Sequence, residues 1–533
     1  MWMKRTGYVY VTLILTIVAL MFRVFYISSG NLNFKVKAVA GRRQTEIALY
    51  NSKGLIYDRN LIPVSGNQFC YYLVINPRDF DKSSLNRLCE LTNVDKNEFT
   101  SKLTSESVFI IESNVKPDDI SGVTVFEGTK RYPQNQISQH ILGYLDSENV
   151  VGLSGIEKSF DKELSCFAAS NSLNYYPDAL NGPIPDAEFS AVKEKDSLNG
   201  LVLTIDKELS EFVEKNMKES ITDGALVIMD ANNGDILSMC SLPGYSSENI
   251  SKHVNSSTSE LVNNAISNQT VGSVFKIIVA ACALLNNVDD FSYNCNGGIE
   301  IEGKTFICQG NKHHGELSLA DAFSESCNSY FIAVGQLLGY DRILETAELF
   351  GVDSSFELCK GLYSSAGKIP KDSGILSLAN LSIGQGDLML SPLTVARMTS
   401  AICNGGYLVN PNLYKSMYID EKIEYKSEYQ YRTQIFNSEI SQKLRKMCIQ
   451  CVEEGTGTNA MPQHSGAGGK TASAQTGLYN SVGEEILNTY FTGFYPAENP
   501  QYVITVFAKN GKSGAATCAP LFSDICDFIH ENY

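Results

Sequence analysis

The chain is poor in positive charge. Its 533 residues include 43 lysines and arginines against 59 aspartates and glutamates, which gives a formal net charge of −16. A surface that binds nucleic acid needs clustered lysine and arginine to neutralise the phosphates, so nucleic acid is excluded as an expected partner. The acidic excess is interpreted as a solvated surface.

The fourteen cysteines lack the two C-x-x-C pairs of a zinc ribbon. One such pair, Cys448–Cys451, falls in a predicted helix and is interpreted as packing. Cys295 and Cys308 flank a short strand-like segment and are candidates for a disulfide, but the sequence does not choose between thiols and disulfides. His313 and His314 are adjacent and therefore point in different directions, so no metal site and no cofactor are expected.

Long apolar runs are also absent, with one exception at residues 8–27. This run has about 20 residues, enough to cross a bilayer core if Arg23 reaches the interface at its far end. No small-x-small cleavage site follows, which favours an uncleaved anchor over a signal peptide. Lys4 and Arg5 precede the run, so residues 1–7 are predicted to form a cytoplasmic stub. The expected location is the cell membrane, single-pass, with the rest of the chain outside the cytoplasm.

The external part divides into two predicted domains, at residues 28–200 and 201–533. The first alternates short strand-like runs, such as Tyr71–Asn76 and Val108–Glu112, with polar turns, and it is interpreted as an elongated β-rich pedestal. In the second, a hairpin is predicted from residue 224 to residue 239 across an Asn-Gly turn. Further apolar strands at 490–495 and 502–507 enclose a helical middle. This order predicts an α/β (α+β) domain with one antiparallel sheet flanked by helices.

Ser273 and Lys276 are the first candidate catalytic pair. Gly272 precedes Ser273, and an apolar helix-forming run extends from Val274 to Leu285, so both side chains are expected at the start of a helix, one turn apart. A serine hydroxyl needs a base, and without a histidine in the motif a lysine must be neutral to serve. Burial beside a second cation would lower its pKa, and Lys470 is the candidate cation.

The remaining motif residues are Ser326 and Asn328, in a predicted loop between two helices, and Lys470 followed by Thr471, before a predicted strand. Each motif is weak alone, since Ser-x-x-Lys recurs in this chain at Ser365. Order and spacing together give a strong signal. S-x-x-K, S-x-N and K-T in this order are typical of serine acyl-transferases that bind penicillin.

The chain resembles the class B penicillin-binding proteins, and the resemblance extends from residue 1 to about residue 530. Beyond the three motifs, short segments along the chain are similar to signatures of that family: Gly54–Asn60, with Lys53 in place of an arginine, Arg131–Pro133, His140–Gly143, Gly152–Glu157, Gly384–Gly386, Ser391–Leu393 and Glu454–Thr456. The resemblance implies the penicillin-binding transpeptidase fold for residues 201–533.

The resemblance also implies the roles of the catalytic residues. Ser273 would attack a D-Ala-D-Ala stem peptide of peptidoglycan and form an acyl-enzyme, which the amine of a neighbouring stem peptide would then resolve into a cross-link. Lys276 would take the serine proton, and Ser326 with Lys470 would relay it to the leaving amine. β-Lactams would acylate Ser273.

Three further residues are implied in substrate binding. Asn328 would bind the amide side of the substrate, Thr471 would help to bind its terminal carboxylate, and the backbone N–H groups of Ser273 and Ser473 would form the oxyanion hole. Ala472 departs from the glycine that usually ends the third motif. A methyl group facing the substrate there would narrow the groove or weaken the binding of some β-lactams, and retained but altered reactivity is expected.

Two alternative functions stay open on the sequence: a slow or non-catalytic penicillin-binding sensor or scaffold, motivated by Ala472, and a membrane-anchored β-lactamase. The implied partner is a polytopic membrane protein that polymerises glycan strands. The sequence does not distinguish roles in division, elongation and sporulation.

Overall fold

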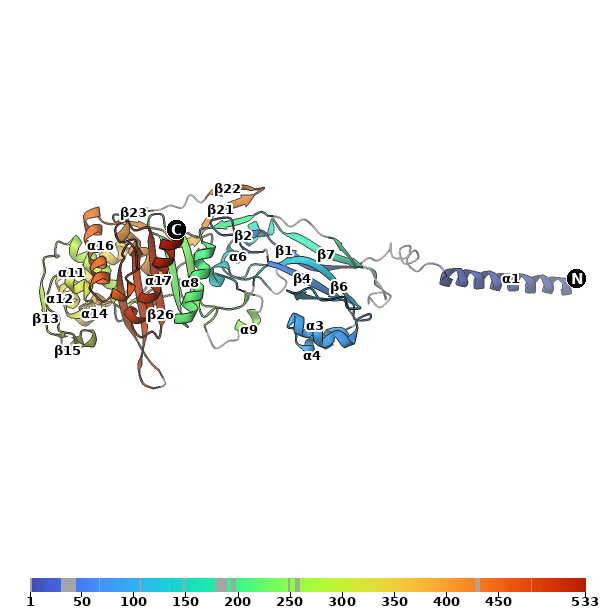
Figure 1. The fold of residues 1–533 in the computed structure, drawn as a ribbon, viewed down its shortest axis with the longest axis horizontal. Helices are drawn as coiled ribbons and strands as arrows, with labels where there is room; N and C mark the ends of the chain where they lie inside the picture. Colours follow the sequence, from blue (N-terminus) through green and yellow to red (C-terminus); the bar gives the residue numbers. More distant parts are fainter. Residues whose placement is uncertain are drawn as a thin grey trace. The chain divides into compact units, whose positions relative to one another are not determined.

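The computed structural model describes residues 2–29, 45–66, 68–105, 107–133, 135–146, 150–177, 189–192, 198–247, 250–254, 259–426, 432–480 and 482–533. The chain forms two compact units that are interleaved in sequence (Figure 1). Unit 1 comprises Met1–Ser52, Phe69–Lys130 and Ala169–Lys195, and unit 2 comprises Lys53–Gln68, Arg131–Ala168 and Asp196–Tyr533. Two segments of the predicted pedestal, 53–68 and 131–168, therefore belong in space to the unit that contains the three motifs.

The apolar run near the N-terminus forms one helix, α1 (Trp2–Ser29). Within it, Gly7–Tyr26 is long and apolar enough to cross a membrane, with a mean hydropathy of 2.1. Its large side chains are exposed rather than packed against the protein. This is what a helix with lipid as its solvent requires, because each backbone group is paired within the helix while the side chains face the acyl chains.

Unit 1 has a central strand, β4, with apolar residues on both faces. Besides α1, the elements of unit 1 are β1 (Thr45–Ser52), β4 (Gln68–Ile75), η1 (Lys82–Ser84), α3 (Leu85–Thr92), α4 (Lys96–Thr104), β5 (Phe109–Ser113), β6 (Val123–Lys130), β7 (Ala169–Tyr175) and β8 (Ser190–Val192). On β4, Leu73 and Ile75 pack with α3 and α4, whereas Tyr72 and Val74 pack in a second cluster with Leu173 of β7. The predicted strands at 71–76 and 108–112 are confirmed as the antiparallel pair β4 and β5.

Unit 2 is built on a five-stranded antiparallel sheet in the order β11-β10-β26-β25-β24. Its strands are β10 (Gly224–Asp230), β11 (Ile236–Leu242), β24 (Gly468–Tyr479), β25 (Glu485–Tyr495) and β26 (Tyr502–Lys509). The predicted hairpin is confirmed, since β10 pairs with β11 across the turn at Gly234. The sheet joins segments from both ends of this part of the chain, as expected, and places β24 at its edge.

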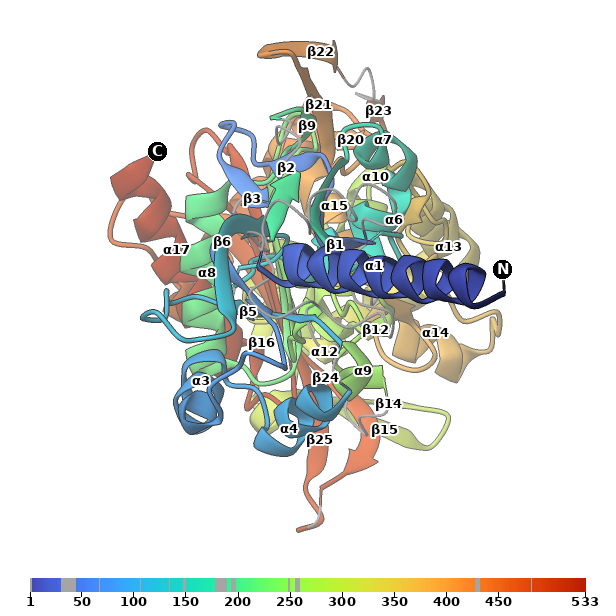
Figure 2. The same ribbon diagram turned by 90° about the vertical axis from the view of Figure 1, so that its right-hand side faces the viewer.

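Helices cover both faces of this sheet. Alternate residues of β10 enter different clusters: Ala225 and Val227 pack with the larger helical layer, and Leu226 and Ile228 pack against α8 (Lys207–Ser220) and α17 (Ala519–Asn532). Figure 2 shows α8 and α17 on one side of the sheet and α10 (Lys276–Leu285) and α15 (Pro392–Cys403) on the other. Burial on both faces explains why the strands read as continuous apolar runs rather than alternating ones.

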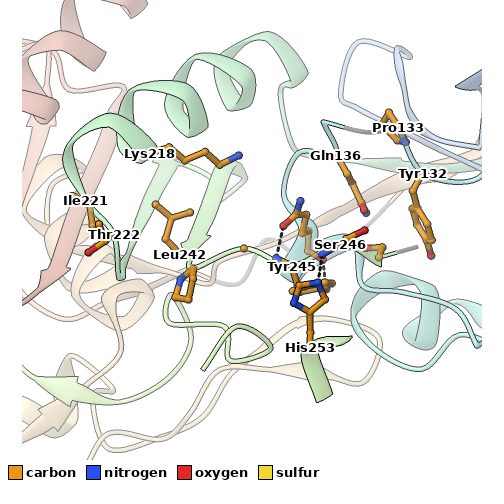
Figure 3. A pocket seen from close by; sticks show the side chains of 14 residues that line it. Tyr132, Pro133, Gln136, Lys218, Ile221, Thr222, Leu242, Tyr245, Ser246 and His253 are labelled. Carbon is orange, nitrogen blue, oxygen red and sulfur yellow. Dashed lines mark hydrogen bonds between the residues drawn. The ribbon is translucent and has the colours of Figure 1, made fainter. Parts of the chain in front are cut away.

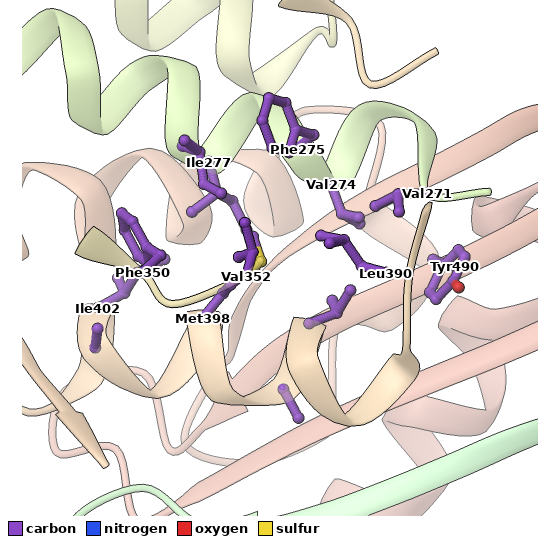
Figure 4. Packing of buried hydrophobic residues seen from close by; sticks show 14 of the residues in the cluster. Val271, Val274, Phe275, Ile277, Phe350, Val352, Leu390, Met398, Ile402 and Tyr490 are labelled. Atoms are coloured by element: carbon purple, nitrogen blue, oxygen red, sulfur yellow. The ribbon is translucent and has the colours of Figure 1, made fainter. Parts of the chain in front are cut away.

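The centre of the helical layer is α10, which is buried on every side. All residues from Lys276 to Leu284 are buried, and only Lys276 among them is charged. Figure 4 shows Val274, Phe275 and Ile277 at the start of this helix packed with residues from α15 and the sheet. A helix that is apolar all round belongs in a core, so this packing holds the first candidate motif.

The remaining elements of unit 2 range from two-residue strands to a 16-residue helix. They are β2 (Leu55–Tyr57), β3 (Pro63–Ser65), α5 (Gln139–Leu142), α6 (Gly155–Ser159), α7 (Asp161–Ser165), β9 (Gly200–Leu203), α9 (Ile250–Val254), β12 (Gln269–Thr270), η3 (Gly272–Phe275), β13 (Tyr293–Cys295), β14 (Gly298–Ile301), β15 (Lys304–Ile307), η4 (Gln309–Asn311), β16 (Gly315–Leu317), α11 (Leu319–Ser324), α12 (Asn328–Leu338), α13 (Tyr340–Leu349), β17 (Glu357–Cys359), β18 (Leu362–Tyr363), α14 (Ile375–Ser382), β19 (Met389–Leu390), β20 (Tyr407–Val409), β21 (Tyr414–Ile419), β22 (Lys422–Lys426), β23 (Arg432–Gln434), α16 (Ser438–Glu453), η5 (Thr458–Ala460) and η6 (Gly514–Cys518). A second sheet of unit 2 has the order β22-β21-β9-β2-β3, with β2 parallel to β9.

The signature segments before residue 160 meet inside unit 2 around a buried ion pair. Arg131 Nε and Nη2 donate to the two carboxylate oxygens of Glu157 at 2.7 and 3.0 Å, and Arg131 Nη1 donates to the Gly54 carbonyl at 2.7 Å. Lys53 forms a hydrogen-bonded ion pair with Asp161. A buried charge requires such partners, so these residues serve packing rather than chemistry.

Candidate active site

Ser273 is held by a turn of two glycines in close contact. Gly272 has a φ of +63° and donates its N–H to the Gly384 carbonyl at 2.9 Å. Gly384 itself has a φ of +74°, and a Cβ there would lie 1.9 Å from the Gly272 carbonyl oxygen. Only glycine fits this approach. The turn continues through η3 into α10 and leaves Ser273 half-buried between fully buried neighbours, where its hydroxyl is accessible.

Lys276 connects the helix of Ser273 to the second motif. Its side chain is fully buried, and Nζ donates to Asn328 Oδ1 at 2.8 Å, to the Ser326 carbonyl at 2.7 Å and to Ser326 Oγ at 3.3 Å. Burial lowers the pKa of Lys276 well below its ordinary range, and the nearby charge of Lys470 lowers it further. A lysine with a lowered pKa is available as a neutral base.

Ser326 lies in the three-residue connection between α11 and α12, and Asn328 is the first residue of α12. Ser326 adopts a φ of +55°, an uncommon backbone conformation for a residue other than glycine. Cys327 caps α12 by accepting a hydrogen bond from the Tyr330 N–H on Sγ. Asn328 Nδ2 donates to the Ile307 carbonyl at 3.1 Å. The second motif therefore presents a hydroxyl and an amide oxygen to Lys276.

Lys470 and Thr471 lie on β24, the edge strand of the main sheet. Lys470 is fully buried with Nζ 5.5 Å from the centre of the Phe323 ring, and burial lowers its pKa. An edge strand leaves backbone groups unpaired on one side, so an extended peptide can bind beside it. Ser473 Oγ accepts a hydrogen bond from the Gly514 N–H at 3.2 Å.

Ala472 does not have the exposure expected of it. Its side chain is 3 % exposed and belongs to the main hydrophobic cluster, next to Tyr490, its pairing partner on β25. A methyl group packed in the core occupies no open groove, so this finding gives no support to a narrowed site.

The Glu454–Thr456 segment joins the third motif to the end of α11, which precedes the second motif, a role that the sequence did not reveal. Thr456 Oγ1 lies 2.7 Å from Thr471 Oγ1, and the Thr456 N–H donates to the Ser324 carbonyl at 3.1 Å. Gly384 and Thr456 are thus supporting residues. The only signal for either was its place in a family-like segment, because both contacts join positions far apart in sequence.

A cluster of three cysteines and one histidine lies directly behind the second motif. The ligand atoms of Cys295, Cys308, His314 and Cys327 all lie within 4.8 Å of one another. All fourteen cysteines are among the described residues and are free thiols, so the disulfide between Cys295 and Cys308 does not form in this structure. The prediction of no metal site was based on the adjacent histidines and on the missing C-x-x-C pairs. It did not take this group of four residues into account.

A pocket of about 550 Å³ in unit 2 contains none of the motif residues. Figure 3 shows its lining, which includes Tyr132, Gln136, Lys218, Tyr245 and His253. His253 is engaged there, since Nε2 accepts from the Ser246 N–H at 3.1 Å and Nδ1 contacts Glu260. This pocket therefore offers no nucleophile and base pair, and the candidate chemistry lies at Ser273.

Family models match most of the chain. The model for the penicillin binding protein transpeptidase domain matches residues 224–527, and the model for the penicillin-binding protein dimerisation domain matches residues 49–176. Stage V sporulation protein D of Bacillus subtilis (strain 168) is 27% identical over 542 residues, covering 94% of this chain and 83% of that protein. The peptidoglycan D,D-transpeptidase MrdA of Acinetobacter baumannii is 24% identical over 544 residues, covering 90% of this chain and 80% of that protein.

Solved structures agree in fold. The penicillin-binding protein PBP2 of Helicobacter pylori, solved in complex with MreC, has a TM-score of 0.66 at 21% identity and covers 92% of this chain and 99% of that chain. Penicillin binding protein 3 of Mycobacterium tuberculosis, solved with ampicillin, has a TM-score of 0.64 at 21% identity and covers 91% of this chain and 96% of that chain. The predicted fold is confirmed.

Proposed function

Since this chain belongs to the class B penicillin-binding proteins, we propose that it is a peptidoglycan D,D-transpeptidase that acts through an acyl-enzyme on Ser273. Its relatives include proteins named peptidoglycan D,D-transpeptidase. The observation that carries the proposal is the buried amine of Lys276, which lies one turn after Ser273 and contacts both Ser326 and Asn328.

In the first half of the reaction, Lys276 removes the proton of Ser273 Oγ as this oxygen attacks the carbonyl between the two D-alanines. The backbone N–H groups of Ser273 and Ser473 bind the oxyanion, an interaction that typically contributes about 3 kcal/mol for one donor. The proton passes by way of Ser326 to the amine of the departing D-alanine, assisted by the charge of Lys470. The acyl group is then bonded to Ser273.

Before acylation, the donor stem peptide lies extended along the edge of β24, where Asn328 binds its amide and Thr471 binds its terminal carboxylate. In the second half, the amine of a neighbouring stem peptide attacks the acyl-enzyme and the ester bond to Ser273 breaks. The proton of the amine returns to Ser273 Oγ by way of Lys276, and the peptide bond that forms is the cross-link. A β-lactam places its strained amide at the same carbonyl position and leaves a long-lived ester on Ser273. The alternative of a slow or non-catalytic sensor or scaffold was based on Ala472 facing the substrate. Ala472 is packed in the core instead, so this alternative has no support from that residue.

The same proposal covers location and partner. We infer that α1 crosses the cell membrane with residues 1–7 in the cytoplasm and unit 2 outside, and that a polytopic glycan polymerase supplies the strands. Protease treatment of spheroplasts should digest an epitope at the C-terminus and spare one at the N-terminus. The reverse pattern would refute the orientation, and crosslinking in the membrane that recovers no glycan polymerase would refute the partner.

The test of the activity is acylation of the full chain in detergent by a fluorescent penicillin. Wild type should label stably and Ser273→Ala should not. Ser365→Ala is the matched control, because Ser365 and Lys368 form another Ser-x-x-Lys in the same unit. Equal labelling of the wild type and Ser273→Ala would reject Ser273 as the nucleophile, and rapid loss of the label would indicate a β-lactamase.

A further inference from the structure

The cluster behind the second motif draws its four residues from separate elements. Cys295 ends β13, Cys308 follows β15, His314 precedes β16, and Cys327 is the middle residue of the second motif. The three cysteines are buried and the histidine is half-buried. The spacing along the chain is C-x₁₂-C-x₅-H-x₁₂-C, with no short pair that would identify it from sequence.

The spacing of the sulfur atoms fits a tetrahedral ion. With zinc–sulfur bonds of about 2.3 Å, two sulfur ligands of one zinc lie about 3.8 Å apart. The separations are 3.7 Å from Cys295 to Cys308 and 3.7 Å from Cys308 to Cys327. Cys295 Sγ lies 3.3 Å from His314 Nδ1. A disulfide requires about 2.05 Å and joins only two sulfurs, so it accounts for neither the third thiol nor the imidazole.

We propose that Cys295, Cys308, His314 and Cys327 form a structural zinc site that holds the second motif in place. Three thiolates and an imidazole are a ligand set that selects zinc, and four protein ligands close the tetrahedron, which is typical of structural rather than catalytic sites. Binding forms four metal–ligand bonds, while each thiol that was protonated releases its proton to solvent.

The segment that carries the ligands has little apolar core of its own. From Cys295 to Leu317, the part that carries three of the four ligands, it forms two small hairpin-like pairs, β13 with β16 and β14 with β15, and its inward apolar residues are few, such as Ile301, Phe306 and Leu317. Small elements of this kind commonly need a metal or disulfides to stay folded. Zinc would attach them to the start of α12.

The contacts of the second motif link this site to catalysis. Cys327 lies between Ser326 and Asn328, and both neighbours contact Lys276. Asn328 also donates to the carbonyl of Ile307, the residue before Cys308. The four ligands therefore act as positioning residues: they fix the loop whose hydroxyl and amide face the base. This consequence rests on the proposed function, whereas zinc binding itself does not.

The experiment measures metal content and acylation separately. The full chain is purified in detergent with reductant and without chelator, and its metals are measured by mass spectrometry. Wild type should hold one zinc per chain and Cys308→Ser at least about tenfold less. Cys518→Ser is the matched control, a buried cysteine outside the cluster, and should keep its zinc. His314→Ala should lose zinc, whereas His314→Cys, which supplies a fourth thiolate, should retain it.

Chelation then tests the positioning role. Removal of zinc should slow acylation by a fluorescent penicillin by about tenfold to 100-fold, and added zinc should restore it. If the variants do not fold, cobalt added to the chelated wild type should give the thiolate charge-transfer bands of a tetrahedral site. Reduced wild type with no zinc and no cobalt bands would overturn the site, as would a Cys295–Cys308 disulfide in the purified chain. Zinc bound with no effect of its removal on acylation would overturn the positioning role alone, and metal binding without any acylation would count against the proposed function only.

Discussion

The two sides of the candidate active site are stabilised by different forces. Ser273 and Lys276 begin α10, whose residues are buried on every side in the largest apolar cluster. Ser326 lies in a short loop and Asn328 is the first residue of α12, and the contacts of this segment are hydrogen bonds and the cysteine and histidine cluster. Apolar packing is insensitive to direction, whereas the loop depends on a few directional contacts. The nucleophile is therefore fixed by the core, while the residues that move its proton depend on a few local hydrogen bonds.

The largest expected effect comes from Lys276→Met, which keeps the packing of α10 and removes the amine that joins the two sides. Acylation by penicillin should fall by about 10²- to 10⁴-fold, the usual range for a general base. The free energy of unfolding should change little, because the removal of a buried amine offsets the loss of its hydrogen bonds to Ser326 and Asn328. Acylation rates and thermal unfolding check this. Wild-type acylation by the variant would show that another group is the base.

Gly384→Ala should destabilise the packing around the start of α10, because it distorts the turn that holds Ser273. Two effects add: the positive φ costs about 1 kcal/mol or more, and the new Cβ meets the Gly272 carbonyl at 1.9 Å. Gly361→Ala is the matched control, with a φ of +73° and open space around the added Cβ. Chemical unfolding should show a substantially larger loss for Gly384→Ala, and equal losses would contradict the contact between the two turns.

The pH dependence of acylation should report the lowered pKa of Lys276. Only neutral Lys276 accepts the proton, so the rate should rise with pH and level off well below the ordinary lysine pKa of 10.5. Lys470→Ala removes a neighbouring positive charge and should move this midpoint to higher pH. Between the lowered pKa and 10.5 the unfolded chain binds more protons than the folded one, so the contribution of Lys276 to stability increases with pH. A midpoint unmoved by Lys470→Ala would exclude the coupling.

Thr456→Val should have the smallest effect and tests the loop side. It removes the hydroxyl that lies 2.7 Å from Thr471 Oγ1 while keeping the shape of the side chain. The expected loss of stability is about 1 kcal/mol, the usual net contribution of one hydrogen bond. The rate of acylation should fall severalfold, because the strand and the end of α11 lose a connection. An unchanged rate would show that this link is not needed for the site.

The sequence was sufficient for features that are local or repeated. The hairpin of β10 and β11 follows from an Asn-Gly turn between apolar runs, and the order of Ser273, Ser326 and Lys470 indicated the reaction. It was not sufficient where segments far apart in sequence meet. The parallel pairing of Leu55–Tyr57 with Gly200–Leu203 gives no local signal, and neither does the cluster around Cys308, since its ligands meet only after the hairpins fold.

The most direct measurement of the central claim is peptide mapping of the purified full chain after reaction with a β-lactam. We expect one adduct per chain, with the mass of the opened β-lactam, on the peptide that contains Ser273. An adduct on another serine, such as Ser365, or no adduct on a folded chain that has retained its native unfolding transition, would contradict it.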